Sequence, residues 1–170
     1  MPEAPIFVVQ LHDARRLHYD VRLEVDGVLK SWAVPRGPSL DPAVKRLAVP
    51  TSDHSIEYAE YEGVLAESKY GSGAVIVWDV GVYQNLTKDK QRRLIDPAEA
   101  IERGHFKFRL QGVKLNGAWA FTRTDRDGDW LMVKVRDAAA DPTLDLTTAE
   151  PQSILSGLSI EEMAATGSDA

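Results

Sequence analysis

The sequence contains no cysteine among its 170 residues and only 4 histidines. The lack of cysteine excludes disulfide frameworks, thiol nucleophiles and thiolate metal sites, so a metal ion would need histidine and carboxylate ligands. No apolar run approaches the roughly 18 residues that a membrane-spanning helix needs, and the start of the chain lacks the regions of a signal peptide. We therefore expect a cytoplasmic protein of ordinary domain size that binds no membrane.

Basic side chains are in the minority, with 20 Lys+Arg against 26 Asp+Glu and a formal net charge of -6. This balance excludes tight, nonspecific coating of nucleic acid through bulk charge, although it allows a local basic patch. Residues 1–50 carry 7 basic and 6 acidic side chains, whereas residues 51–100 carry 5 and 9. An anion site is therefore expected in the first fifty residues, where Arg15, Arg16 and Arg22 lie close in sequence to two histidines.

Helix signals are few, and most apolar residues recur with a period of two, which is typical of strands. The predicted strands span residues 7–12, 17–25, 28–34, 45–49, 73–83, 106–110, 118–124 and 130–135, and the type of the connection at 53–62 is left open. Capping signals predict short helices at Pro97–Arg103 and after Ser159. We predict a mainly β fold, a small antiparallel β-barrel with one or two short helices.

We assign the barrel to residues 1–136 and treat residues 137–170 as a C-terminal extension with a short helix, packed on the barrel or partly disordered. The four tryptophans lie in strand patterns and are expected mostly in the core, with one exposed indole as a candidate for stacking on a terminal base.

One segment, from Gln10 to Arg22, combines the residue types of a metal site. Because side chains alternate along a strand, His18, Asp20 and Arg22 project from one face of their strand. If residues 13–16 fold the two strands into a hairpin, His12 and His18 meet at its closed end beside Asp20. Two imidazoles and a carboxylate would suit Mn²⁺, Zn²⁺ or Fe²⁺ and leave positions open for water and substrate. Arg22 would offer a bidentate grip on an oxyanion such as phosphate.

Three other interpretations fit the same residues. An amphipathic strand with a solvated outer face also shows alternating polar side chains. The facial triad of non-heme iron oxygenases would use His18 and Asp20 with a histidine from far along the chain, which would make His12 dispensable. A non-catalytic module could dock a partner or a nucleic-acid end through a degenerate site.

An ordered series of motifs carries a family resemblance that runs through most of residues 6–136. They are Phe7 to Arg22, Leu29-Lys30-Ser31-Trp32-Ala33-Val34-Pro35-Arg36-Gly37-Pro38-Ser39-Leu40, Lys45-Arg46-Leu47-Ala48-Val49, Asp53-His54, Glu57-Tyr58, Glu62-Gly63-Val64, Tyr70-Gly71, Val75-Ile76-Val77-Trp78-Asp79 and Trp130-Leu131. This series strongly resembles the 3'-phosphoesterase domain of the bacterial repair ligase LigD and its free-standing relatives. The resemblance implies a small β-barrel enzyme that depends on manganese and heals DNA 3' ends. Such an enzyme removes a terminal ribonucleoside and then the resulting 3'-phosphate.

Carried over residue by residue, the resemblance assigns roles to nine positions. The metal ligands fall on His12, His18 and Asp20, and the phosphate-contacting residues on Arg22, His54 and Tyr58. His54 would donate to a non-bridging oxygen or protonate the leaving 3' oxygen, and the sequence does not separate these roles. Gln10, Arg36 and Arg46 are expected to face the phosphate or the DNA backbone. The resemblance implies Mn²⁺ as cofactor, with Zn²⁺ or Co²⁺ as other divalent candidates.

Several departures from the family pattern qualify these expectations. Arg36 stands where the family usually has lysine, and Ser55 replaces a typical proline after the histidine. About six residues precede the first strand, whereas the ligase-embedded domain has a longer leader that contributes polar residues to the site. We therefore expect phosphomonoesterase activity to be more robust than phosphodiesterase activity.

The partners follow from the same resemblance. We expect the substrate to be the 3' end of a DNA or DNA/RNA primer, with an end-joining ligase, polymerase or Ku protein as possible partners. The sequence has no Lys-x-Asp-Gly motif, so we do not expect the chain itself to be a nucleotide-transferring ligase. Because Met1 lies close to the first strand, we expect a stand-alone enzyme, and we expect it to be a monomer.

Overall fold

The computed structural model describes residues 4–68 and 71–167. Tyr70, one of the residues behind the family resemblance, lies outside the described residues. The strands are β1 (Ile6–Asp13), β2 (Leu17–Val25), β3 (Val28–Val34), β4 (Arg46–His54), β5 (Gly63–Ser68), β6 (Gly71–Asn85), β7 (His105–Gly112), β8 (Asn116–Arg123) and β9 (Trp130–Lys134). The helices are the 3-10 helix η1 (Ile56–Glu60) and the α-helices α1 (Pro97–Arg103), α2 (Leu146–Ala149) and α3 (Ile160–Gly167).

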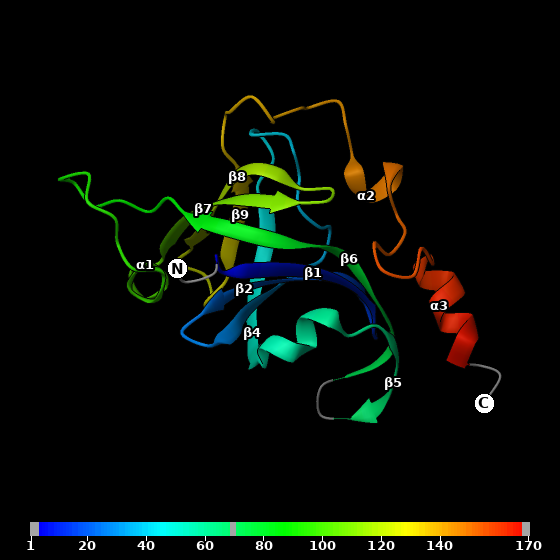
Figure 1. The fold of residues 1–170 in the computed structure, drawn as a ribbon. Helices are drawn as coiled ribbons and strands as arrows, with labels where there is room; N and C mark the ends of the chain where they lie inside the picture. The colour runs from blue at the N-terminus through cyan, green and yellow to red at the C-terminus, as the bar shows by residue number, and fades with distance from the viewer. Residues whose placement is uncertain (1–3, 69–70, 168–170) are drawn as a thin grey trace.

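The strands form one antiparallel sheet that closes on itself (Figure 1). The order is β1-β2-β3-β4-β9-β8-β7-β6-β5, and β1 also pairs with β6. This extra pairing closes eight strands into a barrel and leaves β5 attached outside the ring, next to β6. The predicted small antiparallel barrel is therefore confirmed.

The barrel interior is filled by the apolar residues that the period of two selected. Phe7, Val9 and Leu11 of β1 and Val21 and Leu23 of β2 all belong to one large core cluster. All four tryptophans are buried, with at most 4% of their surface exposed, so the prediction of one exposed indole for base stacking is wrong. A flat indole fills more barrel volume than any other side chain, and burying it removes a large apolar area from water.

The outer face of β1 is also buried, which alternation alone does not predict. A second, smaller cluster of Val8, Leu29, Ala59 and Val77 lies on this side. Ala59 comes from η1, so this helix covers part of the barrel wall. The connection left open at 53–62 is thus the end of β4 followed by η1.

The predicted helices form where their caps indicated. Asp96 caps α1 by accepting a hydrogen bond from the Ala98 amide, and Gly104 ends the helix in the left-handed conformation. At the start of α3, Ser159 and Glu162 exchange backbone-to-side-chain hydrogen bonds, as a capping box requires. A further short helix, α2, forms within the C-terminal segment that the sequence patterns left as a loose connector.

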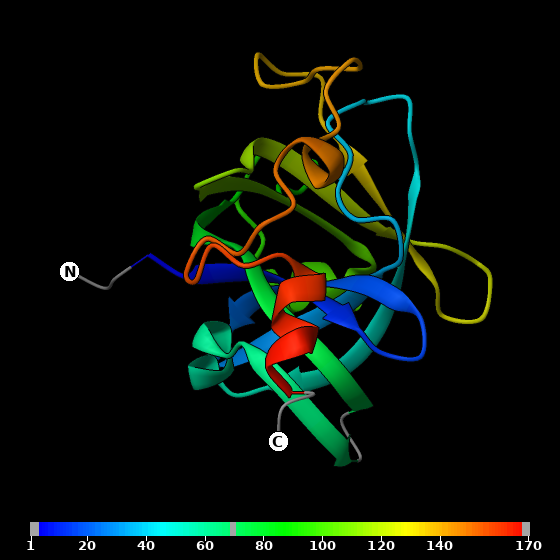
Figure 2. The ribbon, with the colours of Figure 1, turned by 90° about the vertical axis from the view of Figure 1, so that its right-hand side faces the viewer.

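The C-terminal segment crosses one side of the barrel, and α3 packs against β5 and β6 (Figure 2). Within residues 4–68 and 71–167, no helix has the length and apolar character to cross a membrane.

Candidate metal centre

The β1–β2 hairpin places the predicted ligands together. In its register His12 pairs with His18, and Gln10 pairs with Asp20. Paired residues of an antiparallel sheet project on the same face, so these side chains gather on the outer wall of the barrel. The imidazole rings of His12 and His18 lie 5.1 Å apart between centroids and meet edge to face.

His12, His18 and Asp20 each offer one ligand atom, and these atoms lie within 4.8 Å of one another. Asp20 Oδ2 is 3.2 Å from His18 Nε2 and 3.9 Å from His12 Nδ1. In the described part of the chain, this is the only group of three or more histidine, aspartate or glutamate residues with such spacing. Two nitrogen ligands and one oxygen ligand suit a divalent transition metal and leave open positions, so the residues fit the expected ion.

The surroundings of His18 prepare it for this role. Its Nδ1 lies 2.9 Å from the Arg16 carbonyl oxygen, which can accept only from a protonated Nδ1. In the neutral ring, Nε2 then carries a lone pair that faces the Asp20 carboxylate, a repulsive arrangement that a cation between them relieves. The Asp20 carboxylate also changes the proton affinity of the His18 ring. Burial lowers the pKa of His18, but the hydrogen bond and charge of Asp20 outweigh burial and leave this pKa raised.

Asp20 connects the metal-ligand group to Arg22. Its Oδ2 lies 3.2 Å from Arg22 Nη2, and both side chains are buried. Burial raises the pKa of Asp20, but the His18 hydrogen bond and the Arg22 charge outweigh it, so this pKa lies below its usual value. The carboxylate is therefore ionised at neutral pH, as a metal ligand must be.

Arg22 is held by several partners on the outer wall. Its Nε donates to Gln10 Oε1 at 2.7 Å, and its Nη1 donates to Ser31 Oγ at 2.9 Å. Nη1 also lies 3.1 Å from His54 Nδ1, and the guanidinium carbon stands 5.1 Å from the centre of the Tyr58 ring. These contacts occupy Nε and Nη1, whereas Nη2 makes the ion pair with Asp20 and is the nitrogen that faces the metal-ligand group.

His54 and Tyr58 reach the same place from the end of β4 and from η1. Their rings lie 4.6 Å apart between centroids. Burial and the Arg22 charge lower the pKa of His54, which favours a neutral ring. Burial raises the pKa of Tyr58, so its phenol keeps its proton and can donate it to an oxyanion.

Gln10 orients both Arg22 and η1. Its side chain is fully buried, and its Nε2 donates to the carbonyl oxygens of Tyr58 and Tyr61 at 2.9 and 3.0 Å. Because its Oε1 accepts from Arg22, both ends of the amide are used within the protein. We therefore describe Gln10 as a residue that positions its neighbours.

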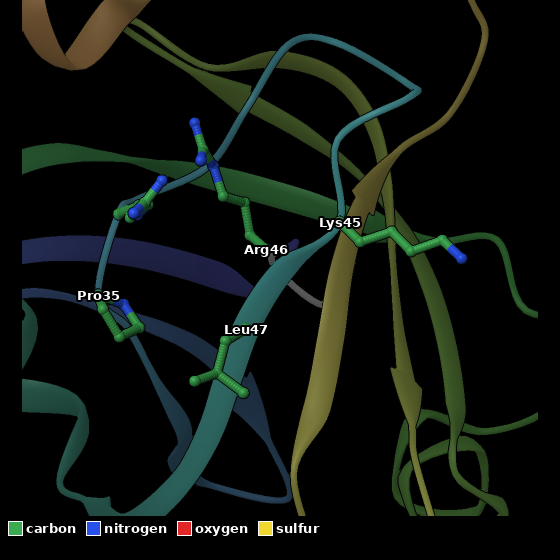
Figure 3. Close-up of a pocket in the computed structure, with 5 residues that line it drawn as sticks. Pro35, Lys45, Arg46 and Leu47 are labelled. Carbon is green, nitrogen blue, oxygen red and sulfur yellow. The ribbon is translucent and has the colours of Figure 1, made fainter.

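Arg36 and Arg46 lie in a separate pocket of about 280 Å³, which Pro35, Lys45 and Leu47 also line. Figure 3 shows the Arg46 side chain directed toward the loop after β3, whereas Lys45 points the opposite way. Pro35 follows β3 two positions beyond Ala33, and Ala33 pairs with Asp20. The pocket therefore begins at the end of β3 that adjoins the metal-ligand strand.

Sequence reasoning missed two residues of the site. Ser31 lies on β3 opposite Arg22 and is buried, and its hydroxyl oxygen accepts a hydrogen bond from the Arg22 guanidinium. The period of two along β3 could have found it, because Ser31 lies on the same face as Arg22 once the pairing is known. Tyr61 stacks on Tyr58 with ring centroids 5.2 Å apart, and no local pattern indicates this contact.

Comparison with known proteins identifies the family of this chain. Residues 10–123 match the family model described as the DNA Ligase D 3'-phosphoesterase domain. The chain is 49% identical over 155 residues to the multifunctional non-homologous end joining protein LigD of Pseudomonas aeruginosa, an alignment of 88% of this chain and 18% of that protein. It is 42% identical over 131 residues to the LigD repair protein of Mycobacterium tuberculosis, covering 77% of this chain and 16% of the relative.

The chain thus spans less than a fifth of the length of these relatives. The family model covers the β1–β2 hairpin from Gln10 onward, together with β3, β4 and η1, which contain His54 and Tyr58. The match includes every element that contributes a side chain to the metal centre. The chain belongs to the DNA ligase D 3'-phosphoesterase domain family.

Proposed function

We propose that this protein is a divalent-metal-dependent phosphoesterase that removes the 3'-phosphate from DNA ends. The observation that carries the proposal is the shared carboxylate of Asp20, which lies 3.2 Å from both His18 Nε2 and Arg22 Nη2. A metal-ligand group and a buried guanidinium thus stand side by side. This arrangement suits a phosphate monoester, whose oxygens need both a cation and directional hydrogen bonds.

The reaction is hydrolysis of the phosphate ester. Water attacks phosphorus, the bond from phosphorus to the 3' oxygen breaks, and the products are a 3'-hydroxyl and inorganic phosphate. Mn²⁺, or Zn²⁺ or Co²⁺ in its place, held by His12, His18 and Asp20, would act as a Lewis acid on the phosphate and lower the pKa of bound water. Nη2 of Arg22, beside Asp20, would also donate to a non-bridging oxygen of the phosphate.

His54 and Tyr58 would complete the phosphate site. His54 Nδ1 lies 3.1 Å from Arg22 Nη1 and 3.0 Å from the Ser52 carbonyl oxygen, and these two contacts call for opposite tautomers of the neutral ring. The tautomer that accepts from Arg22 has its proton on Nε2. That Nε2–H would donate to a non-bridging oxygen or to the leaving 3' oxygen. The Tyr58 phenol, which stays protonated, would be a second donor.

Arg36 and Arg46 would contact the DNA strand that leads to the scissile phosphate. Their pocket is lined by basic residues and by the apolar side chains of Pro35 and Leu47, a combination that suits a nucleotide. A protein of net charge -6 would bind DNA weakly away from this end. Removal of a 3'-terminal ribonucleoside is proposed as a second, weaker activity at the same centre.

The biological setting proposed is end joining, since the relatives' names place them in that repair process. An end-joining ligase, polymerase or Ku protein would then supply or use the healed end.

The test uses two primer–templates, one that ends in a 3'-phosphate and one that ends in a single 3' ribonucleotide, each incubated with the protein and Mn²⁺. Gel positions separate loss of the nucleoside from loss of the phosphate. We expect phosphate release from a 3'-phosphate primer and slower shortening of the ribonucleotide primer, and neither with Asp20→Ala. End binding without any product in Mn²⁺ would support the non-catalytic module. An oxygenase would instead keep its metal and oxygen-dependent turnover in His12→Ala.

A further inference from the structure

The helix η1, which contains Tyr58, is attached to the barrel from two sides. On the side of the metal centre, Gln10 binds the carbonyl oxygens of Tyr58 and Tyr61. On the other side the attachment comes from the C-terminal segment of the chain, through Glu62, the residue that follows Tyr61.

Glu62 joins three distant parts of the chain. Its Oε1 accepts from the backbone amide of Val77 in β6 at 3.0 Å and from the Ser153 hydroxyl at 2.6 Å. Ser153 is buried, and its Oγ also accepts from the amides of Leu155 and Ser156 at 3.0 Å. The hydroxyl therefore ties a turn of the C-terminal segment to the end of the Tyr58 helix.

Ile154 adds an apolar contact at the same place. Its amide donates to the Val77 carbonyl oxygen at 3.0 Å. Its side chain packs against the small outer cluster, to which Ile56 and Tyr58 of η1 also pack. The C-terminal segment and the Tyr58 helix thus share one apolar cluster as well as one carboxylate.

The segment is fixed to the barrel upstream of this contact. The Trp78 indole donates to the Glu150 carbonyl oxygen at 2.8 Å. Lys114 donates to the carbonyl oxygens of Glu150 and Gln152 at 2.9 and 2.5 Å, and its ammonium lies 4.5 Å from the Trp78 ring centre. Downstream, α3 packs on β5 and β6, as Figure 2 shows. Residues 150–158, which we call the C-terminal strap, are therefore held at both ends.

We propose that the C-terminal strap positions Tyr58 and His54 for catalysis, with Glu62 and Ser153 as its positioning residues. The inference rests on the proposed function and extends it to the C-terminal strap, which lies beyond the matched family region 10–123; Glu62 lies within that region. The metal ligands come from β1 and β2 alone, so they do not depend on the strap. Displacing the strap should move the phosphate donors and leave the metal centre in place.

Three variants and one matched control separate this role from a general loss of stability. Glu62→Ala and Ser153→Ala each break the link, and Glu62→Ala leaves the Ser153 turn intact. Glu62→Gln keeps an oxygen that accepts from both Val77 and Ser153. Ser156→Ala is the matched control, because Ser156 lies in the same turn and its exposed hydroxyl accepts only from the Leu158 amide.

Three measurements are made on each full-length variant: Mn²⁺ affinity, kcat/KM for phosphate release from a 3'-phosphate primer, and amide hydrogen exchange in residues 55–62. We expect Glu62→Ala and Ser153→Ala to lose about tenfold or more in kcat/KM, since small misplacements of donors have large effects on rate. Exchange in 55–62 should accelerate by a similar factor, with Mn²⁺ affinity within about twofold of wild type. Glu62→Gln and Ser156→Ala should resemble wild type.

Unchanged exchange in 55–62 would overturn the inference, as would a fall in Mn²⁺ affinity parallel to the fall in activity. If wild type releases no phosphate, the proposed function fails, and hydrogen exchange alone still decides whether the strap holds the Tyr58 helix.

Discussion

Replacing Arg22 by lysine tests how the phosphate site is built. The guanidinium contacts Gln10, Ser31, His54 and Asp20 at 2.7, 2.9, 3.1 and 3.2 Å, and it is 4% exposed. Lysine keeps the positive charge beside Asp20 but has three donors on one atom, so it cannot reach partners on several sides. We expect Arg22→Lys to leave the Gln10 and His54 acceptors without this donor.

The size of the effect follows from these contacts. The buried Gln10 acceptor left without its donor costs about 1 to 3 kcal/mol, and the lost contact with half-buried His54 adds a smaller amount, for a total of roughly 2 to 3 kcal/mol. For a chain of this length, such a loss lowers Tm by about 4 to 12 °C. Loss of an oriented donor to the phosphate should reduce kcat by roughly 10² to 10³.

The assay compares thermal unfolding by circular dichroism with phosphate release under saturating Mn²⁺. Arg103→Lys is the control, because its ion pair with Glu99 is on the surface, with both side chains more than half exposed. That change should shift Tm by less than about 2 °C. If Arg22→Lys kept activity within threefold of wild type, the guanidinium would not be the phosphate-binding group, and the reasoning would be refuted.

Three further predictions concern other parts of the molecule. His54→Ala should reduce phosphate release by about 10² to 10⁴ while Mn²⁺ affinity stays near wild type, since His54 is not one of the three clustered ligands; isothermal titration checks the affinity. Asp137→Asn should lower the free energy of unfolding by about 1 to 2 kcal/mol, because the buried Lys134 ammonium loses the charge 2.7 Å away. Burial raises the pKa of Asp137, but its hydrogen bonds with Lys134 and with backbone amides outweigh burial and lower this pKa below 3.8. The stabilisation that Asp137 contributes should therefore be full above pH 3.8 and should disappear as the pH falls below that value. Acid unfolding curves measure this loss, which should be absent in Asp137→Asn. Gly112→Ala should destabilise by more than about 2 kcal/mol, because its Cβ would collide with the Asp79 carboxylate and Phe7, whereas Gly128→Ala, in open space at φ +77°, should cost only about 1 kcal/mol in urea unfolding.

The β1–β2 hairpin shows what the sequence can predict. Strand alternation and a short loop sufficed to place His12, His18 and Asp20 together, because register in a hairpin follows from local chain geometry. The barrel class was accessible for the same reason, since turn signals and periods of two are local properties.

The burial of the site was not predictable from local patterns. Polar residues on alternating positions read as a solvated face, yet Gln10 and Arg22 are covered by η1, a segment some forty residues away in sequence. His54 and Tyr58 received weight only from the family resemblance, because neither lies in a strand pattern that points at Arg22. The contacts of Ser153 and Ile154 join residues more than seventy positions apart, and no period or spacing encodes such contacts.

The most direct test of the central claim is phosphate release from a 3'-phosphate DNA primer by protein that has first been stripped of metal with a chelator. The account predicts no release by the metal-free protein, restoration by Mn²⁺, and no restoration in Asp20→Ala that unfolds as cooperatively as wild type. Equal phosphate release by the metal-free protein, or by Asp20→Ala, would contradict it.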